Sequence, residues 1–345
     1  MCTNFRIRAA ADGTVVVGRS MEFPYGVIGT RLAVLPRGYE GTAMAPEGKV
    51  GATWTATYGC VGMSAFGHDS LLTDGLNEAG FSAHLLYMRG DYCTFAEFHG
   101  DGKDLPQVNL IAYLLGTCGS VADVEAAMTK IRVWGLDPGM GTAPTIHIGV
   151  YDESGSKVIE FHPDGPHIID NPAGVMTNAP YLDWHLTNLA NYVNMNPGNG
   201  PDEPMKIGEF TPQILGSGYG MVGSPGDYTT PGRYIRAALQ IAFARQAKNG
   251  TEAELQALHI LNTVDMMPGI ARESADAAAA MHADPATLDE VTVWITLSNL
   301  SQKRYLYRTM NDPTVYAVDL DRIDFTAPAR SRDISWTATF AEVTV

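Results

Sequence analysis

Segments that favour β-strands lie at both ends of this chain, and helix-like segments lie between them. Near the amino end they cover 5–9, 14–18 and 31–35, which predicts a meander that begins close to residue 2. Near the carboxyl end they cover 291–297, 303–308 and 315–318. No linker or repeat divides the chain. We therefore expect one α+β domain over residues 2–345, with sheets built from distant parts of the sequence.

The central part of the chain has helical periodicity in two places. From 106 to 131 the apolar residues follow one helical face as far as Gly119, and Ser120 to Asp123 then has the spacing of a capping box. After a hairpin expected at 146–161, helices are predicted at 232–247 and 251–264. The second would begin with a capping box of Thr251 and Glu254. Residues 275–283 could be helical or mobile.

Residues 194–226 form a long stretch without periodicity. It contains eight glycines and five prolines and is too long for an ordinary connection within a compact domain. We interpret it as a functional or assembly loop.

Charge and hydropathy exclude several classes of function. The net charge of -15, from 38 acidic and 23 basic residues, repels phosphate backbones, so no nucleic-acid partner is expected. No apolar run reaches the roughly 18 residues of a membrane span, and the first eight residues, MCTNFRIR, lack the apolar core of a secretory signal. These features predict a soluble, cytoplasmic protein.

The cysteines and histidines do not form a recognisable metal motif. The four cysteines, Cys2, Cys60, Cys93 and Cys118, are widely spaced. His162, His167 and His185 could be ligands in principle, but isolated histidines in turns usually have structural roles or are solvated. We assign no metal and no cofactor.

Cys2 directly follows the initiator methionine, so removal of Met1 would create a free amino-terminal cysteine. Its thiol can attack a carbonyl while its own α-amine, a group with a pKa of about 7.7 to 8.0 in peptides, accepts and returns the proton. Position alone does not establish this role, because any chain can have Cys there.

Four further segments place polar residues among apolar or glycine-rich neighbours. They are GRSMEF at 18–23, DGLNEAG at 74–80, GVMTNAP at 174–180 and SPGDYTTPGR at 224–233. Each has an ordinary explanation: Arg19 and Glu22 as a surface pair, the NEAG run and Asn178 as turn residues, and Arg233 as a solvated helix residue.

Together and in this order behind Cys2, these segments resemble the choloylglycine hydrolase family of N-terminal-nucleophile (Ntn) amidases, which includes bile salt hydrolases and penicillin V acylases. The resemblance implies a four-layer αββα sandwich, cleavage of a linear amide in a small acyl amide substrate, and a homotetramer assembled through a segment like 194–226.

The resemblance also implies catalytic roles. Cys2 would be the nucleophile, and Arg19 would favour its thiolate. Asn178 and the backbone amide of Tyr87 would bind the oxyanion, and Arg233 would complete the charged shell. Glu22 stands where the family usually has aspartate, which in relatives contacts the α-amine. The longer side chain of Glu22 could still reach the amine, but the geometry of that contact does not follow from the resemblance.

Substrate preference is read from the expected acyl pocket of Met21, Phe23 and Tyr87, although plain core packing would also account for Met21 and Phe23. Bile salt hydrolases usually carry Asn where this chain has Tyr87, and some penicillin V acylases carry Tyr. Penicillin V acylase-like activity is therefore the first expectation and bile salt hydrolysis the close alternative. N-acyl homoserine lactone cleavage and a non-catalytic ligand-binding protein are further alternatives.

Overall fold

The computed structural model describes residues 1–24, 28–200, 205–272, 284, 288–338, 340 and 343. The fold is built on two large antiparallel sheets, sheet A and sheet B. Sheet A has seven strands in the described residues, with β15 paired beside β16. Its strands are, in order, β14 (Val175–Met176), β1 (Cys2–Arg6), β2 (Val16–Pro24), β16 (Asp289–Asn299), β17 (Arg304–Thr309) and β18 (Tyr316–Asp319), with β15 (Ala271–Arg272). The amino-terminal and carboxyl-terminal strands therefore pair in one sheet, as the sequence predicts.

Sheet B has eight strands in the described part of the chain. They are, in order, β13 (Gly165–Asp170), β12 (Ser156–His162), β11 (Ile146–Tyr151), β8 (Ser82–Tyr87), β7 (His68–Asn77), β6 (Cys60–Ala65), β3 (Arg31–Leu35) and β19 (Arg330–Asp333). The predicted three-strand meander is wrong, because β3 pairs with β6 and β19 in sheet B instead of following β2 in sheet A. Two small two-stranded sheets, β4 (Glu40–Thr42) with β5 (Thr53–Thr55) and β9 (Asp104–Pro106) with β10 (Arg132–Trp134), lie outside both.

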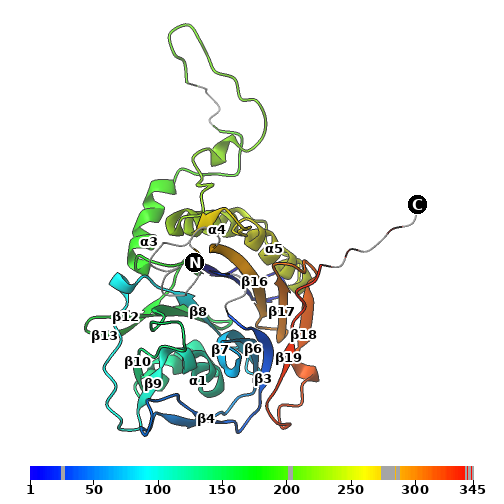
Figure 1. The fold of residues 1–345 in the computed structure, drawn as a ribbon. Coiled ribbons are helices and arrows are strands. Elements are labelled where there is room, and N and C mark those ends of the chain that lie inside the picture. The colour runs from blue at the N-terminus through cyan, green and yellow to red at the C-terminus, as the bar shows by residue number, and fades with distance from the viewer. Residues whose placement is uncertain are drawn as a thin grey trace.

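Helices cover the outer face of each sheet, and the inner faces pack on one another (Figure 1). Helix α1 (Leu110–Thr117) packs on β7 and β8, whereas α4 (Thr230–Phe243) and α5 (Gly250–Asn262) pack on β1, β2, β14 and β16. The remaining helices are α2 (Val124–Met128) and α3 (Leu182–Asn188), with 3₁₀ turns at Gly90–Tyr92, Gln107–Asn109, Val121–Asp123, Leu189–Tyr192, Tyr219–Met221 and Leu320–Arg322. This is a four-layer αββα sandwich of the Ntn-hydrolase type.

Burial on both faces explains why β2 was predicted only at its start. Every residue of VVGRSMEFP except Phe23 is buried, because sheet A lies between sheet B and the helices α4 and α5. A strand buried on both sides does not alternate between apolar and polar residues. Its polar residues, Arg19, Ser20 and Glu22, are therefore inside the molecule.

The helix boundaries test the two predicted capping boxes. Ser120 and Asp123 form theirs at the turn before α2. The box of Thr251 and Glu254 is wrong: α5 begins at Gly250, where the side chain of Asn249 accepts a hydrogen bond from the Glu252 N–H at 3.0 Å. Glu254 is buried instead against Arg304.

Residues 194–226 leave the sandwich as an arm, whose described part contains one 3₁₀ turn (Figure 1). The predicted segment 275–283 lies outside the described residues. Among the described residues, none of the helices has the length and apolar character that crossing a membrane requires.

Candidate active site

Cys2 is the first residue of β1 and lies opposite Met21 of β2. Its side chain is buried and faces the space between the two sheets. The Sγ atom lies 3.8 Å from Met21 Sδ and 4.0 Å from Arg19 Nη2. Pairing of β1 with β2 therefore brings the thiol and a guanidinium together.

Arg19 is held in place by a fully buried ion pair. Its Nη1 donates to Asp74 Oδ2 of β7 at 3.1 Å, its Nη2 donates to the Leu85 carbonyl at 2.9 Å, and its Cζ lies 5.7 Å from the ring centroid of Trp294. Asp74 also accepts a hydrogen bond from the Tyr305 hydroxyl. Desolvation raises the pKa of Asp74, and the charge of Arg19 partly offsets this. The ion pair of Arg19 and Asp74 thus joins sheet A to sheet B next to the Cys2 thiol.

Glu22 lies on the other face of β2, because side chains alternate along a strand. Its carboxylate accepts hydrogen bonds from Ser20 Oγ at 3.0 Å and from Thr292 Oγ1 at 2.8 Å. Burial raises the pKa of Glu22, while Arg233 and the amino terminus act in the opposite direction. The carboxylate is desolvated and held by two hydroxyls.

Asn178 and Arg233 link the main chain of Cys2 to β8. Arg233 Nη1 donates to the Cys2 carbonyl at 2.5 Å and to Thr3 Oγ1 at 2.8 Å, and its Nη2 donates to Asn178 Oδ1 at 2.8 Å. Asn178 Nδ2 donates to the Tyr87 carbonyl at 2.6 Å. Burial lowers the pKa of Arg233, but a guanidinium remains charged.

Met1 is attached in this structure, so the nitrogen of Cys2 is a peptide N–H. It donates to Asn178 Oδ1 at 2.9 Å. The amine of Met1 contacts Glu290 Oε1 at 2.5 Å and donates to the Glu22 carbonyl at 3.1 Å. The expected contact of the Glu22 carboxylate is with the α-amine that Cys2 acquires when Met1 is removed; here that carboxylate binds hydroxyls.

A pocket opens beside Cys2, with about 590 Å³ of empty space that is partly open to solvent. Its lining is apolar or aromatic except for Glu22, Thr73 and Thr145. The other lining residues are Cys2, Met21, Phe23, Ile28, Ala65, Phe66, Leu71, Leu72, Leu85, Tyr87, Val108, Met140, Pro144 and Ile146. The structure thus places Met21, Phe23 and Tyr87 on one pocket, as the sequence predicts. The lining contains no cluster of metal ligands within the described chain.

The remaining cysteines are poor nucleophiles. Burial raises the pKa of Cys60 to about 12, and that of Cys93 and Cys118 to about 11. Only thiolates attack and bind metals efficiently. Cys2 is the cysteine that borders the pocket.

The explanations of Arg19 and Glu22 as a surface pair and of Arg233 as a solvated residue are wrong, whereas the NEAG run does form a turn, with a hydrogen bond from the Gly80 N–H to the Asn77 carbonyl at 3.0 Å. Arg19 and Arg233 are fully buried, and Glu22 and Asn178 are 1% and 4% exposed, so none is a solvated surface residue. Sequence reasoning missed the polar residues around them: Asp74 binds Arg19, Thr292 binds Glu22, Tyr305 binds Asp74, and Glu290 binds the amine of Met1. Asp74 at least lies in the DGLNEAG run; the other three come from the carboxyl-terminal strands, and no local pattern marks them.

Comparisons with known proteins identify the family of the chain. A model of the linear amide C-N hydrolases, choloylglycine hydrolase family, matches residues 2–334. The chain is 27% identical over 328 residues to a bile salt hydrolase/transferase of Clostridium perfringens, covering 93% of each chain. It is 24% identical over 305 residues to a penicillin V acylase of Pectobacterium atrosepticum, covering 81% of this chain and 70% of the other.

The fold is similar to a solved structure over its full length. The crystal structure of a mutant conjugated bile acid hydrolase from Clostridium perfringens matches with a TM-score of 0.85 at 25% identity, covering 100% of each chain. With the family model spanning nearly the whole sequence, this chain belongs to the choloylglycine hydrolase family and is a hydrolase of linear amide carbon–nitrogen bonds.

Proposed function

We propose that this enzyme cleaves conjugated bile salts or closely related amides of a bulky apolar acyl group, with Cys2 as the nucleophile. The observation that carries the proposal is the placement of the Cys2 thiol at an apolar pocket beside the Arg19 guanidinium. Similarity over 93% of both chains to a bile salt hydrolase/transferase supports the bile salt as substrate. This ranking reverses the preference for penicillin V that Tyr87 suggests in the sequence.

The mechanism follows from the chemistry of these groups. After Met1 is removed, the α-amine of Cys2 takes the thiol proton as Sγ attacks the amide carbonyl, and it then returns a proton to the leaving amine. Asn178 Nδ2 and the Tyr87 backbone amide are the proposed oxyanion donors. Water then attacks the thioester and releases the acyl group.

Arg233 and Glu22 are proposed as positioning residues. Arg233 holds both the Cys2 carbonyl and Asn178 Oδ1, so it aligns the nucleophile with the oxyanion donor. Glu22 would orient the freed α-amine from the opposite face of β2.

A second candidate, penicillin V acylase-like activity, is favoured by one observation. The Tyr87 side chain lines the pocket yet is 46% exposed, so its ring can border a flat aromatic acyl group at the mouth.

The test compares kcat/KM for glycocholate, taurocholate, phenoxymethylpenicillin and an N-acyl homoserine lactone, with Cys2→Ser as the control. We expect glycocholate or taurocholate to give the highest value. Tyr87→Asn should leave the backbone donor in place and lower the relative rate on phenoxymethylpenicillin. Efficient cleavage of phenoxymethylpenicillin alone would reverse the ranking, and no cleavage of any amide would favour a ligand-binding protein.

We also propose that residues 2–345 act as one domain in a homotetramer joined through 194–226. The cytoplasmic location stays a prediction from the sequence.

A further inference from the structure

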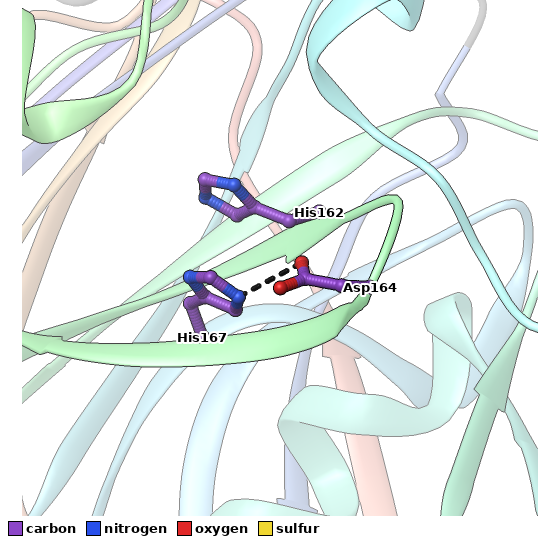
Figure 2. Close-up of side chains that lie close together, drawn as sticks. All are labelled: His162, Asp164 and His167. Carbon is purple, nitrogen blue, oxygen red and sulfur yellow. Dashed lines mark hydrogen bonds and ion pairs between the residues drawn. The ribbon is translucent and has the colours of Figure 1, made fainter.

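Two histidines and an aspartate meet at the tip of the β12–β13 hairpin, away from the pocket (Figure 2). They are His162, the last residue of β12, Asp164 of the turn, and His167 of β13. One potential ligand atom from each lies within 4.8 Å of the other two. We propose that this cluster is a binding site for a divalent transition-metal ion of the zinc type.

The register of the hairpin explains why these side chains meet. Glu160 pairs with His167 across the two strands, and His162 follows Glu160 by two residues. Side chains two apart on a strand, and those opposite each other on its partner, lie on the same face. The turn then brings Asp164 to the same place, with His167 Nε2 donating to its Oδ1 at 2.9 Å.

This donor set suits a particular class of ion. Imidazole nitrogens and a carboxylate favour zinc, copper and nickel over magnesium and calcium, which prefer oxygen ligands alone. Ligands bound to tetrahedral zinc at 2.0–2.2 Å lie about 3.3–3.6 Å from one another. The His167 and Asp164 atoms are 2.9 Å apart, so a small separation of these two exposed side chains lets an ion replace the proton of their hydrogen bond. Three protein ligands leave the fourth position to water.

His162 is already oriented as metal-binding histidines usually are. Its Nε2 lies 3.1 Å from Glu160 Oε2, and the buried Glu160 carboxylate accepts a second hydrogen bond from the Leu182 N–H at 2.8 Å. Its ring also stacks on Tyr181, with centroids 3.9 Å apart. A carboxylate behind a histidine fixes its tautomer and strengthens the other nitrogen as a ligand. Nδ1 of His162 is thus the atom left for the ion.

One adjustment is needed for binding. The rings of His162 and His167 are stacked, with centroids 4.1 Å apart and planes only 8° from parallel. Parallel rings cannot both direct an in-plane lone pair at one ion, so one ring must tilt. The side chain of His167 is 42% exposed and that of Asp164 is 74% exposed, which leaves both free to move toward the ordered His162.

The test measures Zn²⁺ binding by calorimetry to the full chain carrying Cys2→Ala, because the Cys2 thiolate would otherwise bind zinc too. We expect one equivalent to bind, and His167→Ala and Asp164→Asn each to weaken binding by more than the roughly 10- to 100-fold that loss of a supporting residue costs. His259→Ala, which removes an exposed histidine of α5, is the matched control and should leave the affinity unchanged. Circular dichroism checks that each variant is folded.

Co²⁺ supplies an independent readout. Bound to the same protein, it should show ligand-field bands, which His167→Ala abolishes. Because Cys2 is replaced in this protein, the bands should appear without a thiolate charge-transfer band. Failure of the Cys2→Ala protein to bind one equivalent of Zn²⁺ would overturn the proposal. So would a Zn²⁺ affinity of the His167→Ala and Asp164→Asn variants that equals that of the Cys2→Ala protein.

Discussion

At the scale of single residues, each face of β2 in the site has one carboxylate and one guanidinium beside it. Arg19 faces the space between the sheets, where Asp74 neutralises it. Glu22 faces the helices, where Arg233 is the cation that most lowers its pKa against burial. Buried charges are stable only when paired and hydrogen-bonded, so each member is fixed in position.

The first prediction concerns the amino terminus. The active protein should begin at Cys2, because a retained Met1 turns the base into a non-basic amide that donates to Asn178 Oδ1. Intact-mass measurement of active protein should show the loss of one methionine. Cys2→Ser should keep the fold and lose most of the turnover, because a hydroxyl is a weaker nucleophile. Full activity in protein that still carries Met1 would disprove the mechanism.

The second prediction concerns Glu22. Glu22→Gln keeps the size and removes the charge, and a hydrogen bond to a charged group contributes about 1.5–3 kcal/mol. That corresponds to a fall of about 10- to 100-fold in kcat, with a smaller change in KM. A matched control is Glu254→Gln, which removes another buried carboxylate, bound to Arg304 outside the pocket. A change confined to KM would instead limit Glu22 to substrate binding, with no role in orienting the α-amine.

The pH profile gives the same prediction a second readout. Burial raises the pKa of Glu22, so its carboxylate form is complete only above a higher pH than for an ordinary glutamate. If that form is required, kcat is full above the raised pKa and falls as the pH is lowered through it. Glu22→Gln should remove this acid limb.

At the scale of helices and strands, α4 is the element on which the position of Arg233 depends. The helix begins after Thr229, whose Oγ1 accepts a hydrogen bond from the Gly232 N–H at 3.2 Å. Arg233 lies in the first turn, and its own N–H bonds to the Thr229 carbonyl. A capped amino end thus holds the guanidinium at Cys2 and Asn178.

The third prediction tests this cap. Thr229→Ala should lower the free energy of unfolding by about 1 kcal/mol, measured by urea denaturation, because one N–H loses its acceptor. Thr229→Ser keeps the hydroxyl and should cost much less. Equal losses in both variants would show that the methyl group, rather than the cap, stabilises the helix start.

The elements also show how far sequence reasoning reaches. The hairpin of β11 and β12, the capping box before α2 and the carboxyl-terminal strands follow from local patterns and are confirmed. The extent of β2 does not, because burial on both faces removes the alternation. The strand expected at 5–9 is misplaced, because β1 covers Cys2–Arg6. The order of strands depends on long-range pairing, so the predicted meander is wrong: β3 lies in sheet B, beside β6 and β19.

The candidate site divides in the same way. Cys2, Arg19, Glu22, Asn178 and Arg233 belong to motifs and could be predicted, and the structure brings them together. Thr292 binds Glu22, Tyr305 binds Asp74 and Glu290 binds Met1 only because β16 and β17 return from the far end of the chain to sheet A. From the sequence, His162 and His167 are candidate ligands but are set aside as isolated histidines, because cross-strand register, rather than sequence spacing, makes them neighbours.

At the scale of the whole molecule, the packing of a single chain does not explain the apolar surface of the arm formed by 194–226. The arm extends from the sandwich and exposes large apolar side chains: Met205, Ile207, Phe210, Ile214, Leu215 and Val222. Monomeric proteins seldom expose apolar residues in such numbers on one segment. An interface between copies of the chain would bury them.

The last prediction concerns this assembly. Phe210 and Leu215 are 66% and 87% exposed, so changing both to Asp should leave the fold intact while placing charge where the interface must be dry. Light scattering after size exclusion should show a tetramer for the unmodified chain and smaller species for the double variant. Leu255→Asp, which changes an exposed leucine of α5, is the control outside the arm.

Ionic strength gives the same prediction a second readout. Each chain carries a net charge of -15, so the chains repel one another on assembly. Salt screens this repulsion, so the tetramer should be favoured as ionic strength rises. A monomer at every salt concentration, or a tetramer that survives both aspartates, would show that the arm does not assemble the enzyme.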